Sequence, residues 1–168
     1  KGVAIAEDCA VRALDMAGGR VAGVVTEQGR IAADRVVLAG GAWSSLFLAR
    51  HGARIPQLSV RATVAATAPL PDFHSGAAAD SNFALRRRMD GGYTLAPCHF
   101  HEFFIGPDAV HHLKPFWTHI RAELSGARLL PAAPRSYPDG WLTPRRWSED
   151  QITPFERMRI LDAAPNLA

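Results

Sequence analysis

Residues 35–45 constrain the fold of this chain more than any other stretch. They read Arg-Val-Val-Leu-Ala-Gly-Gly-Ala-Trp-Ser-Ser, so an apolar, β-branched run is followed by four residues with little or no side chain. The run at residues 36–38 predicts a strand buried on both faces, and apolar residues from Leu46 onward have helical spacing. Small residues between a strand and a helix let the backbone approach a bulky ligand, often one that carries phosphate.

The composition predicts a packed domain. A chain of 168 residues with 48% hydrophobic residues can build one core or parts of two, which excludes a fully disordered protein. The chain begins at Lys1 without a methionine and ends soon after Pro165, so we expect a piece of a longer protein. The net charge of +3 fits an anionic ligand or nucleic acid, but a compositional bias of the source is the favoured explanation.

Cysteine usage and hydropathy give expectations about location. Cys9 and Cys98 lie far apart and lack the spacing of a metal site, which is typical of a reduced, cytoplasmic protein. No apolar run reaches the ~18 residues that a membrane-spanning helix requires, and no signal peptide is visible.

Short strands and tight turns dominate the first third of the chain. Strands are expected over residues 9–15, 21–26 and 31–38, joined as an antiparallel meander. A short helix follows at 46–51, with Gly52 as the residue after its end and with Ser44 and Ser45 expected to cap its start.

The remainder predicts an antiparallel sheet with one or two helices. Strands are expected over residues 58–66, 83–88, 92–97 and 102–106, with a loop at 72–81. Residues 107–124 have helical spacing, and Pro115 implies that this helix either begins near that residue or is kinked there. Residues 126–154 predict an irregular segment with one strand. The expected fold class is therefore α+β, with the small meander as a separate element.

Three segments together carry a resemblance to a known family. The meander of residues 9–34 leads into the glycine-containing stretch at 36–44; the hairpin 83–95 contains Asp-Gly-Gly-Tyr; and residues 157–162 read Arg-Met-Arg-Ile-Leu-Asp. This arrangement resembles the FAD-dependent oxidoreductase superfamily of D-amino-acid oxidase, glycine oxidase and D-amino-acid dehydrogenase. In that family the hairpin belongs to the sheet that covers the isoalloxazine ring.

The resemblance implies domains, a cofactor and a reaction. Residues 1–54 would belong to the FAD-binding domain, 55–150 to the substrate-binding domain, and 151–168 to a segment that returns toward the first. The parent protein would oxidise an amine or amino acid by hydride transfer to the flavin. The family's N-terminal G-x-G-x-x-G and its C-terminal flavin segment are absent, so the isolated fragment is expected to be inactive. It would also expose the surface that faces FAD, which favours self-association.

The resemblance also assigns cofactor-binding residues. Val11 matches a position whose backbone holds the adenine end of FAD, and Ala39, Gly40, Gly41 and Trp43 lie along the nucleotide. There are alternative explanations for these residues. Val11 fits a packed strand position, Gly40 and Gly41 fit a turn that needs positive φ, and Trp43 fits a core position.

Recognition of a substrate carboxylate is assigned to Arg159, with Arg157 as the alternative, since a guanidinium binds a carboxylate with two parallel hydrogen bonds and stays charged. A surface arginine is the alternative explanation for either residue.

Two other function classes stay open. Residues 98–102 contain Cys98, His99 and His101, and a strand would place both histidines on one face, as in a non-enzymatic ligand- or metal-binding module. A metal needs a third ligand, for which His111 and His112 are candidates, but the spacing matches no established motif and we expect no metal. The arginine run at 86–88 favours a basic interaction domain, although nucleic acid is not the expected partner.

Overall fold

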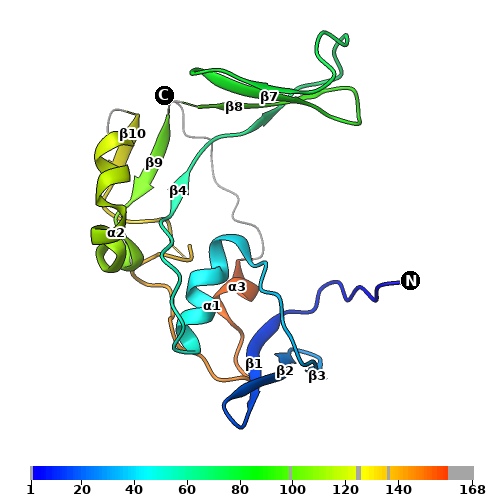
Figure 1. The fold of residues 1–168 in the computed structure, drawn as a ribbon, viewed down its shortest axis with the longest axis vertical. Coiled ribbons are helices and arrows are strands. Elements are labelled where there is room, and N and C mark those ends of the chain that lie inside the picture. The colour runs from blue at the N-terminus through cyan, green and yellow to red at the C-terminus, as the bar shows by residue number, and fades with distance from the viewer. Residues whose placement is uncertain (1, 99, 124–125, 136, 159–168) are drawn as a thin grey trace. The chain divides into compact units, whose positions relative to one another are not determined.

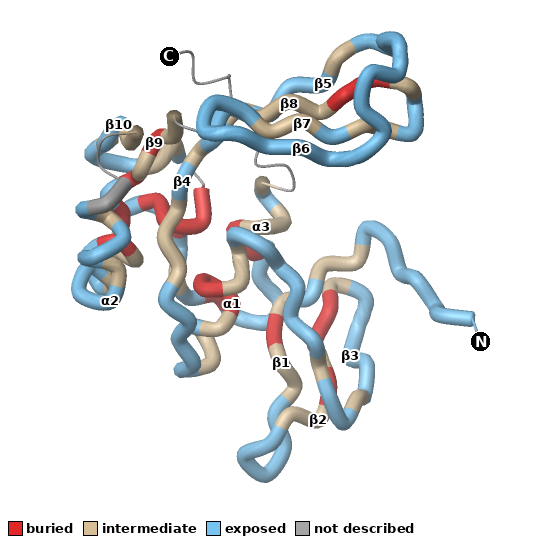
Figure 2. The backbone as a smooth tube through the Cα atoms, turned by 45° about the horizontal axis from the view of Figure 1, so that its top comes forward, coloured by how far each residue is buried: buried red, intermediate tan, exposed pale blue. Residues whose placement is uncertain are grey.

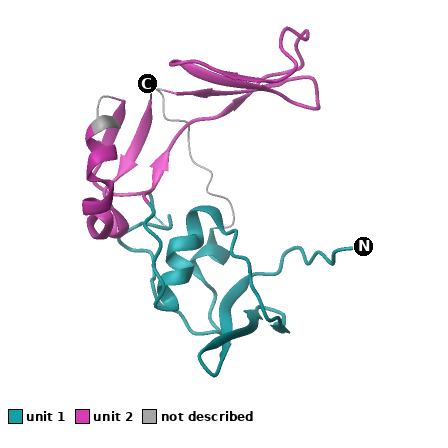
Figure 3. Cartoon of the chain, in the orientation of Figure 1, with its two compact units in different colours: residues 1–57, 134–161 teal, residues 58–133, 162–168 magenta. Residues whose placement is uncertain are grey.

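The chain has an α+β fold (Figure 1), as predicted. The computed structural model describes residues 2–98, 100–123, 126–135 and 137–158. The chain divides into two compact units (Figure 3): unit 1 contains Lys1–Gln57 and Pro134–Leu161, and unit 2 contains Leu58–Ala133 and Asp162–Ala168. Residues 134–150, which the sequence grouped with the second region, therefore pack with unit 1. The assignment of the predicted regions to FAD and substrate domains stays a prediction.

The predicted meander forms the sheet of unit 1. Strands β1 (Val11–Ala17), β2 (Arg20–Thr26) and β3 (Gly29–Ala32) pair antiparallel in that order. The chain reverses between β1 and β2 at Gly18 and Gly19, whose φ values of 57° and 77° lie in the left-handed region that glycine adopts without steric cost. The turn residues and the apolar alternation therefore specify the same hairpin.

The expected strand at 31–38 is wrong beyond Ala32. Residues 36–38 belong to no strand in the described part of the chain, and Val37 is 90% exposed. A strand exists only where a neighbour completes its ladder, and among the described residues this run has none. The sequence signal for burial on both faces is therefore not satisfied by the described part of the chain.

The core of unit 1 is aromatic. It centres on Leu46 and Phe47 of α1 (Ser44–Arg50) together with Trp147. Figure 2 shows the buried positions of α1 in red. A short 3₁₀ helix, η1 (Gly41–Trp43), leads into α1, and the last helix, α3 (Pro154–Arg157), adds Phe155 to the same cluster.

The end of α1 agrees with the prediction but its start does not. Gly52 follows the helix with a φ of 74°, as expected for the residue after a helix end. The N-cap is Trp43, without a side-chain cap bond, so a serine cap is wrong. The chain enters α1 through η1, and the side chain of Gln57 accepts from the backbone N–H of Ser45 at 3.3 Å.

Unit 2 contains two sheets. The four-stranded sheet is antiparallel in the order β5-β8-β7-β6, and the three-stranded sheet has the order β10-β9-β4. The strands are β4 (Val60–Arg61), β5 (Ala65–Ala66), β6 (Ala77–Ala79), β7 (Phe83–Arg87), β8 (Tyr93–Pro97), β9 (His101–Phe104) and β10 (Ala127–Leu130). The β7–β8 hairpin confirms the prediction. The expected strand at 58–66 instead splits into β4 and β5, which join different sheets, and the expected loop at 72–81 contains β6.

Strands β9 and β10 form the parallel pair of the described sheets. Parallel neighbours need a long crossover, and α2 (Pro107–Glu123) provides it. The helix begins at Pro107 and continues through Pro115, so the prediction of a helix over this stretch is confirmed and a start near Pro115 is wrong. Proline at the first helical turn is favourable because its missing N–H would have no partner there.

One buried tyrosine fixes the loop that covers the hairpin. The Tyr93 ring is 1% exposed and stacks on Phe73 with ring centroids 4.3 Å apart. Its hydroxyl donates to the carbonyl of His74 at 3.0 Å and accepts from the backbone N–H groups of Phe73 and His74 at 3.2 Å. The loop therefore packs against β8 through one fully bonded polar group.

We predict that Gly23→Ala destabilises unit 1 by about 1–3 kcal/mol. A Cβ at Gly23 would lie 2.1 Å from the backbone oxygen of Ile31, so β2 and β3 would have to separate. Gly2→Ala is the matched control, because a Cβ there meets nothing within 4 Å. Urea unfolding of both variants measures the difference, and equal stability would contradict the register of β2 and β3.

Candidate functional site

An apolar groove with a volume of about 340 Å³ opens on unit 1. Strands β1 and β2, the 36–40 segment, η1, α1 and α3 all contribute to it. We call it the unit 1 groove; its lining residues are Val11, Val24, Val36, Val37, Leu38, Ala39, Gly40, Trp43, Phe47 and Phe155. None of these side chains is charged or polar. Such a lining suits the flat, apolar part of a ligand.

Aromatic contacts fix three of the lining side chains. The ring of Phe155 lies 6.1 Å from that of Trp43, 6.4 Å from that of Phe47 and 5.8 Å from that of Trp147, with tilted or edge-to-face geometry. Aromatic pairs in such orientations add about 0.5–1.5 kcal/mol each beyond area burial. The aromatic lining is therefore held in place by the core of unit 1.

The opposite wall, residues 36–40, is exposed backbone. Among the described residues, the backbone N–H groups of 36–39 make no hydrogen bond to another backbone group. Gly40 closes the segment by accepting from the N–H of Trp43 at 3.0 Å. Since backbone N–H groups need a partner or water, these groups are available to donate to water or to a bound molecule.

Four of the five predicted cofactor residues line the unit 1 groove: Val11, Ala39, Gly40 and Trp43. They come from β1, the 36–40 segment and η1. Val11 is distant from the other three in the sequence, and the fold brings it close to them. Their role in cofactor binding stays a prediction.

The fifth predicted residue, Gly41, is not among the lining residues. Its φ is 53°, it begins η1, and its carbonyl accepts from the side-chain amide of Gln57 at 3.3 Å. The turn conformation therefore explains the glycine at this position.

The sequence analysis missed Val24, Phe47 and Phe155. One signal was available for the last: Thr153 and Glu156 flank Pro154 and Phe155 in the T-x-x-E pattern of a capping box. The structure contains that box, with Glu156 N–H donating to Thr153 Oγ1 at 3.2 Å and Thr153 N–H to Glu156 Oε2 at 2.7 Å. The box orients α3 and with it the Phe155 ring.

The ion pair of Arg12 and Glu156 ties β1 to α3. Arg12 Nη2 donates to Glu156 Oε1 at 2.8 Å, and the two side chains are 15% and 6% exposed. The Arg12 carbonyl accepts from Trp147 Nε1 at 2.8 Å and from Arg50 Nη1 at 3.3 Å. By contrast, the bonds of Arg30 to Asp15 and Glu149 join largely exposed side chains and contribute little to stability.

This contact shifts the pKa of both partners. Burial alone would raise the pKa of Glu156, but hydrogen bonds from Arg12 and Thr153 outweigh it and lower that pKa. The hydrogen bond to Glu156 raises the pKa of Arg12. Both groups are therefore charged at neutral pH.

His51 is a neutral support beside α1. Its Nε2 accepts from the N–H of Leu14 at 3.1 Å, and its ring lies 5.3 Å from that of Phe47. Burial and the neighbouring Arg50 lower the pKa of His51, which agrees with an accepting ring nitrogen.

Of the arginines predicted to bind a carboxylate, Arg159 lies outside the described residues. Arg157 is exposed at the end of α3 and lines a different hollow from the unit 1 groove, together with Arg146.

Two members of the run 86–88 contact their own unit. Arg87 lies 4.8 Å above the Tyr93 ring and donates to the Leu70 carbonyl at 3.0 Å, while Arg88 pairs with Asp90. The run therefore does not present three free cations.

The histidine-rich segment is described only in part, because His99 lies outside the described residues. His101 begins β9, and His111 Nδ1 lies 2.7 Å from the Pro107 carbonyl. Within the described ranges no group of three or more His, Cys, Asp or Glu could hold a metal ion. No helix in that same part of the chain is long and apolar enough to span a membrane.

Comparison with known proteins identifies the family. The model of the DAO family, described as FAD dependent oxidoreductase, matches residues 1–167. The chain belongs to this family. The resemblance seen in the sequence is therefore confirmed, and with it a family whose cofactor is FAD.

Relatives of this FAD-dependent family are larger than the chain. A glycine oxidase of Pseudomonas putida is 33% identical over 133 residues, which cover 76% of this chain and 36% of the relative. A D-amino acid dehydrogenase of Sinorhizobium medicae is 48% identical over 62 residues, 37% of this chain and 15% of the relative. The chain thus spans about a third or less of the length of these curated relatives.

A solved structure supports the same family. The L-amino acid deaminase of Proteus myxofaciens, determined in complex with anthranilate, has a TM-score of 0.74 and 30% sequence identity to this chain. The match covers 90% of this chain and 34% of the deaminase.

We predict that Glu156→Gln lowers the stability of unit 1 at neutral pH by about 1–3 kcal/mol, because Arg12 is left partly buried with a neutral partner. Since the folded pKa of Glu156 is lowered, its stabilisation is complete above the usual value of 4.5 and is lost as the pH falls through the folded pKa. The variant loses this part of the acid dependence. Urea titrations between neutral and acid pH measure it, with the exposed Glu7→Gln as control; parallel curves for wild type and Glu156→Gln would contradict the account.

Proposed function

We propose that the unit 1 groove binds a flat, uncharged part of FAD in a longer protein that oxidises amino acids. One observation carries this proposal: four residues chosen from the sequence as cofactor contacts line a single groove. Family membership supplies the identity of the cofactor.

The lining fits a ring system better than a phosphate. Val11, Val24 and the aromatic side chains offer apolar surfaces to the faces of a ring, and the N–H groups of 36–39 offer donors to its edge. A diphosphate calls for cations or several convergent donors, and none of the described residues that line the groove has a charged side chain. The contact of Val11 with the adenine end of FAD, which the family resemblance implies, is consistent with this chemistry.

Each lining group has a definite task in this proposal. Ala39 and Gly40 keep the wall thin, so that the ligand can approach the backbone. Trp43 and Phe155 form a rigid apolar surface that excludes water from one face of the ring. FAD, when bound, supplies the group that accepts a hydride from the substrate.

The names of the relatives support a proposal for the substrate class. A glycine oxidase, a D-amino acid dehydrogenase and an L-amino acid deaminase are all named for amino acids, so we propose an amino acid substrate. Its carboxylate would be bound by Arg159 or, alternatively, by Arg157. For the isolated chain we propose self-association, since Val3, Ile5 and Val37 are 82% to 90% exposed.

Filling the groove should weaken cofactor binding. In the full-length protein, Ala39→Phe is expected to raise the dissociation constant for FAD about tenfold or more, because the new ring occupies ligand space. Ala53→Phe, at an exposed position outside the groove, is the matched control and should leave binding unchanged. Flavin fluorescence during titration of the apoprotein measures both. A full-length protein that contains no flavin, or equal affinity in the two variants, would refute the proposal.

Replacing the carboxylate-binding arginine should affect substrate binding more than turnover. We expect Arg159→Leu in the full-length protein to raise KM for the best amino acid about 10- to 100-fold, the value of one lost charge-assisted contact. Arg157→Leu tests the alternative residue and the exposed Arg20→Leu is the control. Formation of 2-oxo acid measures the rates. If no amino acid is oxidised by the wild type, the amino acid assignment fails; if both variants match the wild type, the arginine assignment fails.

A further inference from the structure

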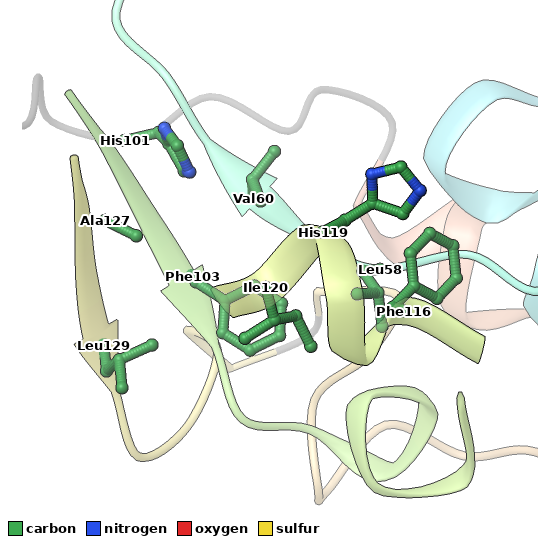
Figure 4. A pocket seen from close by; sticks show the side chains of 9 residues that line it. All are labelled: Leu58, Val60, His101, Phe103, Phe116, His119, Ile120, Ala127 and Leu129. Carbon is green, nitrogen blue, oxygen red and sulfur yellow. The ribbon is translucent and has the colours of Figure 1, made fainter. Parts of the chain in front are cut away.

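A second hollow lies within unit 2, between α2 and one face of the β10-β9-β4 sheet (Figure 4). Its volume is about 120 Å³. We call it the α2 cleft. Val60, Phe103 and Leu129 line it from the sheet, and Phe116 and Ile120 line it from the helix.

Strand alternation keeps charge out of the α2 cleft. His101, Phe103, Ala127 and Leu129 occupy alternate positions of β9 and β10 and line it, so the residues between them lie on the other face of the sheet. Those intervening residues include a buried ion pair: Glu102, 4% exposed, accepts from Arg61 Nε at 2.6 Å, and Arg128 lies 3.7 Å from the same carboxylate. The charges of this sheet are thus separated from the cleft by the sheet itself.

Among the described residues that line the α2 cleft, two imidazoles are the polar side chains. His101 comes from β9 and His119 from α2, and Figure 4 shows the His101 ring near Val60 and the His119 ring beside Phe116. Within the described residues neither ring takes part in a hydrogen bond or ion pair. A neutral imidazole has one donor and one acceptor nitrogen, so each can bond a hydroxyl in either direction.

We propose that the α2 cleft binds a single-ring phenol, with the ring against the apolar lining and the hydroxyl bonded to His119 or His101. The volume of about 120 Å³ leaves room for no more than one ring, because an enclosed apolar cavity of about 150 Å³ takes a single benzene. The histidines favour a hydroxyl over an unsubstituted ring. An aromatic carboxylate is disfavoured, since Arg61 and Arg128 lie on the opposite face of the sheet. This site does not depend on the unit 1 groove or on FAD.

Methyl NMR of the 168-residue chain, titrated with phenol or benzene, tests the site. We expect saturable shifts of the Val60, Ile120 and Leu129 methyl signals, with phenol bound about fivefold more tightly than benzene, as one hydrogen bond would provide. His119→Phe with His101→Phe keeps the ring shapes and should bring phenol to the affinity of benzene. Absence of saturable shifts, equal affinity for the two ligands in the wild type, or tighter binding of benzoate would overturn the proposal.

Filling variants test the location. Ala127→Leu puts bulk into the α2 cleft and should abolish the shifts, whereas Ala79→Leu, on the other sheet of unit 2, should leave them unchanged. Leu129 is 50% exposed and accepts a larger side chain, so Leu129→Phe serves if Ala127→Leu does not fold. Phenol binding that survives both filling variants would place the ligand elsewhere and overturn the proposal.

Discussion

The backbone carbonyl and the guanidinium of Arg12 hold unit 1 together. The carbonyl accepts hydrogen bonds from Trp147 and Arg50, and the guanidinium binds Glu156. One residue of β1 therefore contacts α1, α3 and the loop residue Trp147. All three partners are more than 30 residues from Arg12 in the sequence, and Trp147 and Glu156 are more than 130 residues from it. Val11 immediately precedes Arg12 and Phe155 immediately precedes Glu156, so the contact also sets the two sides of the unit 1 groove.

This arrangement separates stability from binding. The ion pair of Arg12 and Glu156 satisfies its own charges, and neither residue is among those that line the groove. Among the described residues, the groove is lined by uncharged side chains and the backbone of residues 36–40. A ligand there competes with water alone and does not have to displace an internal ion pair. The α2 cleft of unit 2 follows the same rule, because the Glu102 ion pair occupies the opposite face of its sheet.

Local patterns in the sequence predicted the local structure. The β7–β8 hairpin, the meander and α2 follow from alternation, turn residues and helical spacing, each of which acts within about 20 residues. The strand predicted at residues 36–38 was wrong because an apolar, β-branched run forms a strand only when a neighbouring strand pairs with it. Phe155 was missed for a related reason: its capping box is visible in the sequence, but its contact with Trp43 spans more than a hundred residues. Gly40 and Gly41 look alike in the sequence, and only the φ values and the groove lining separate a wall residue from a turn residue.

A crystal structure of the full-length protein grown with FAD tests the central claim most directly. The account predicts a ring of the cofactor in the unit 1 groove, in van der Waals contact with Val11 and Trp43 and with an edge toward the backbone of residues 36–39. A cofactor bound elsewhere, with this groove filled by side chains of the same protein, would contradict it.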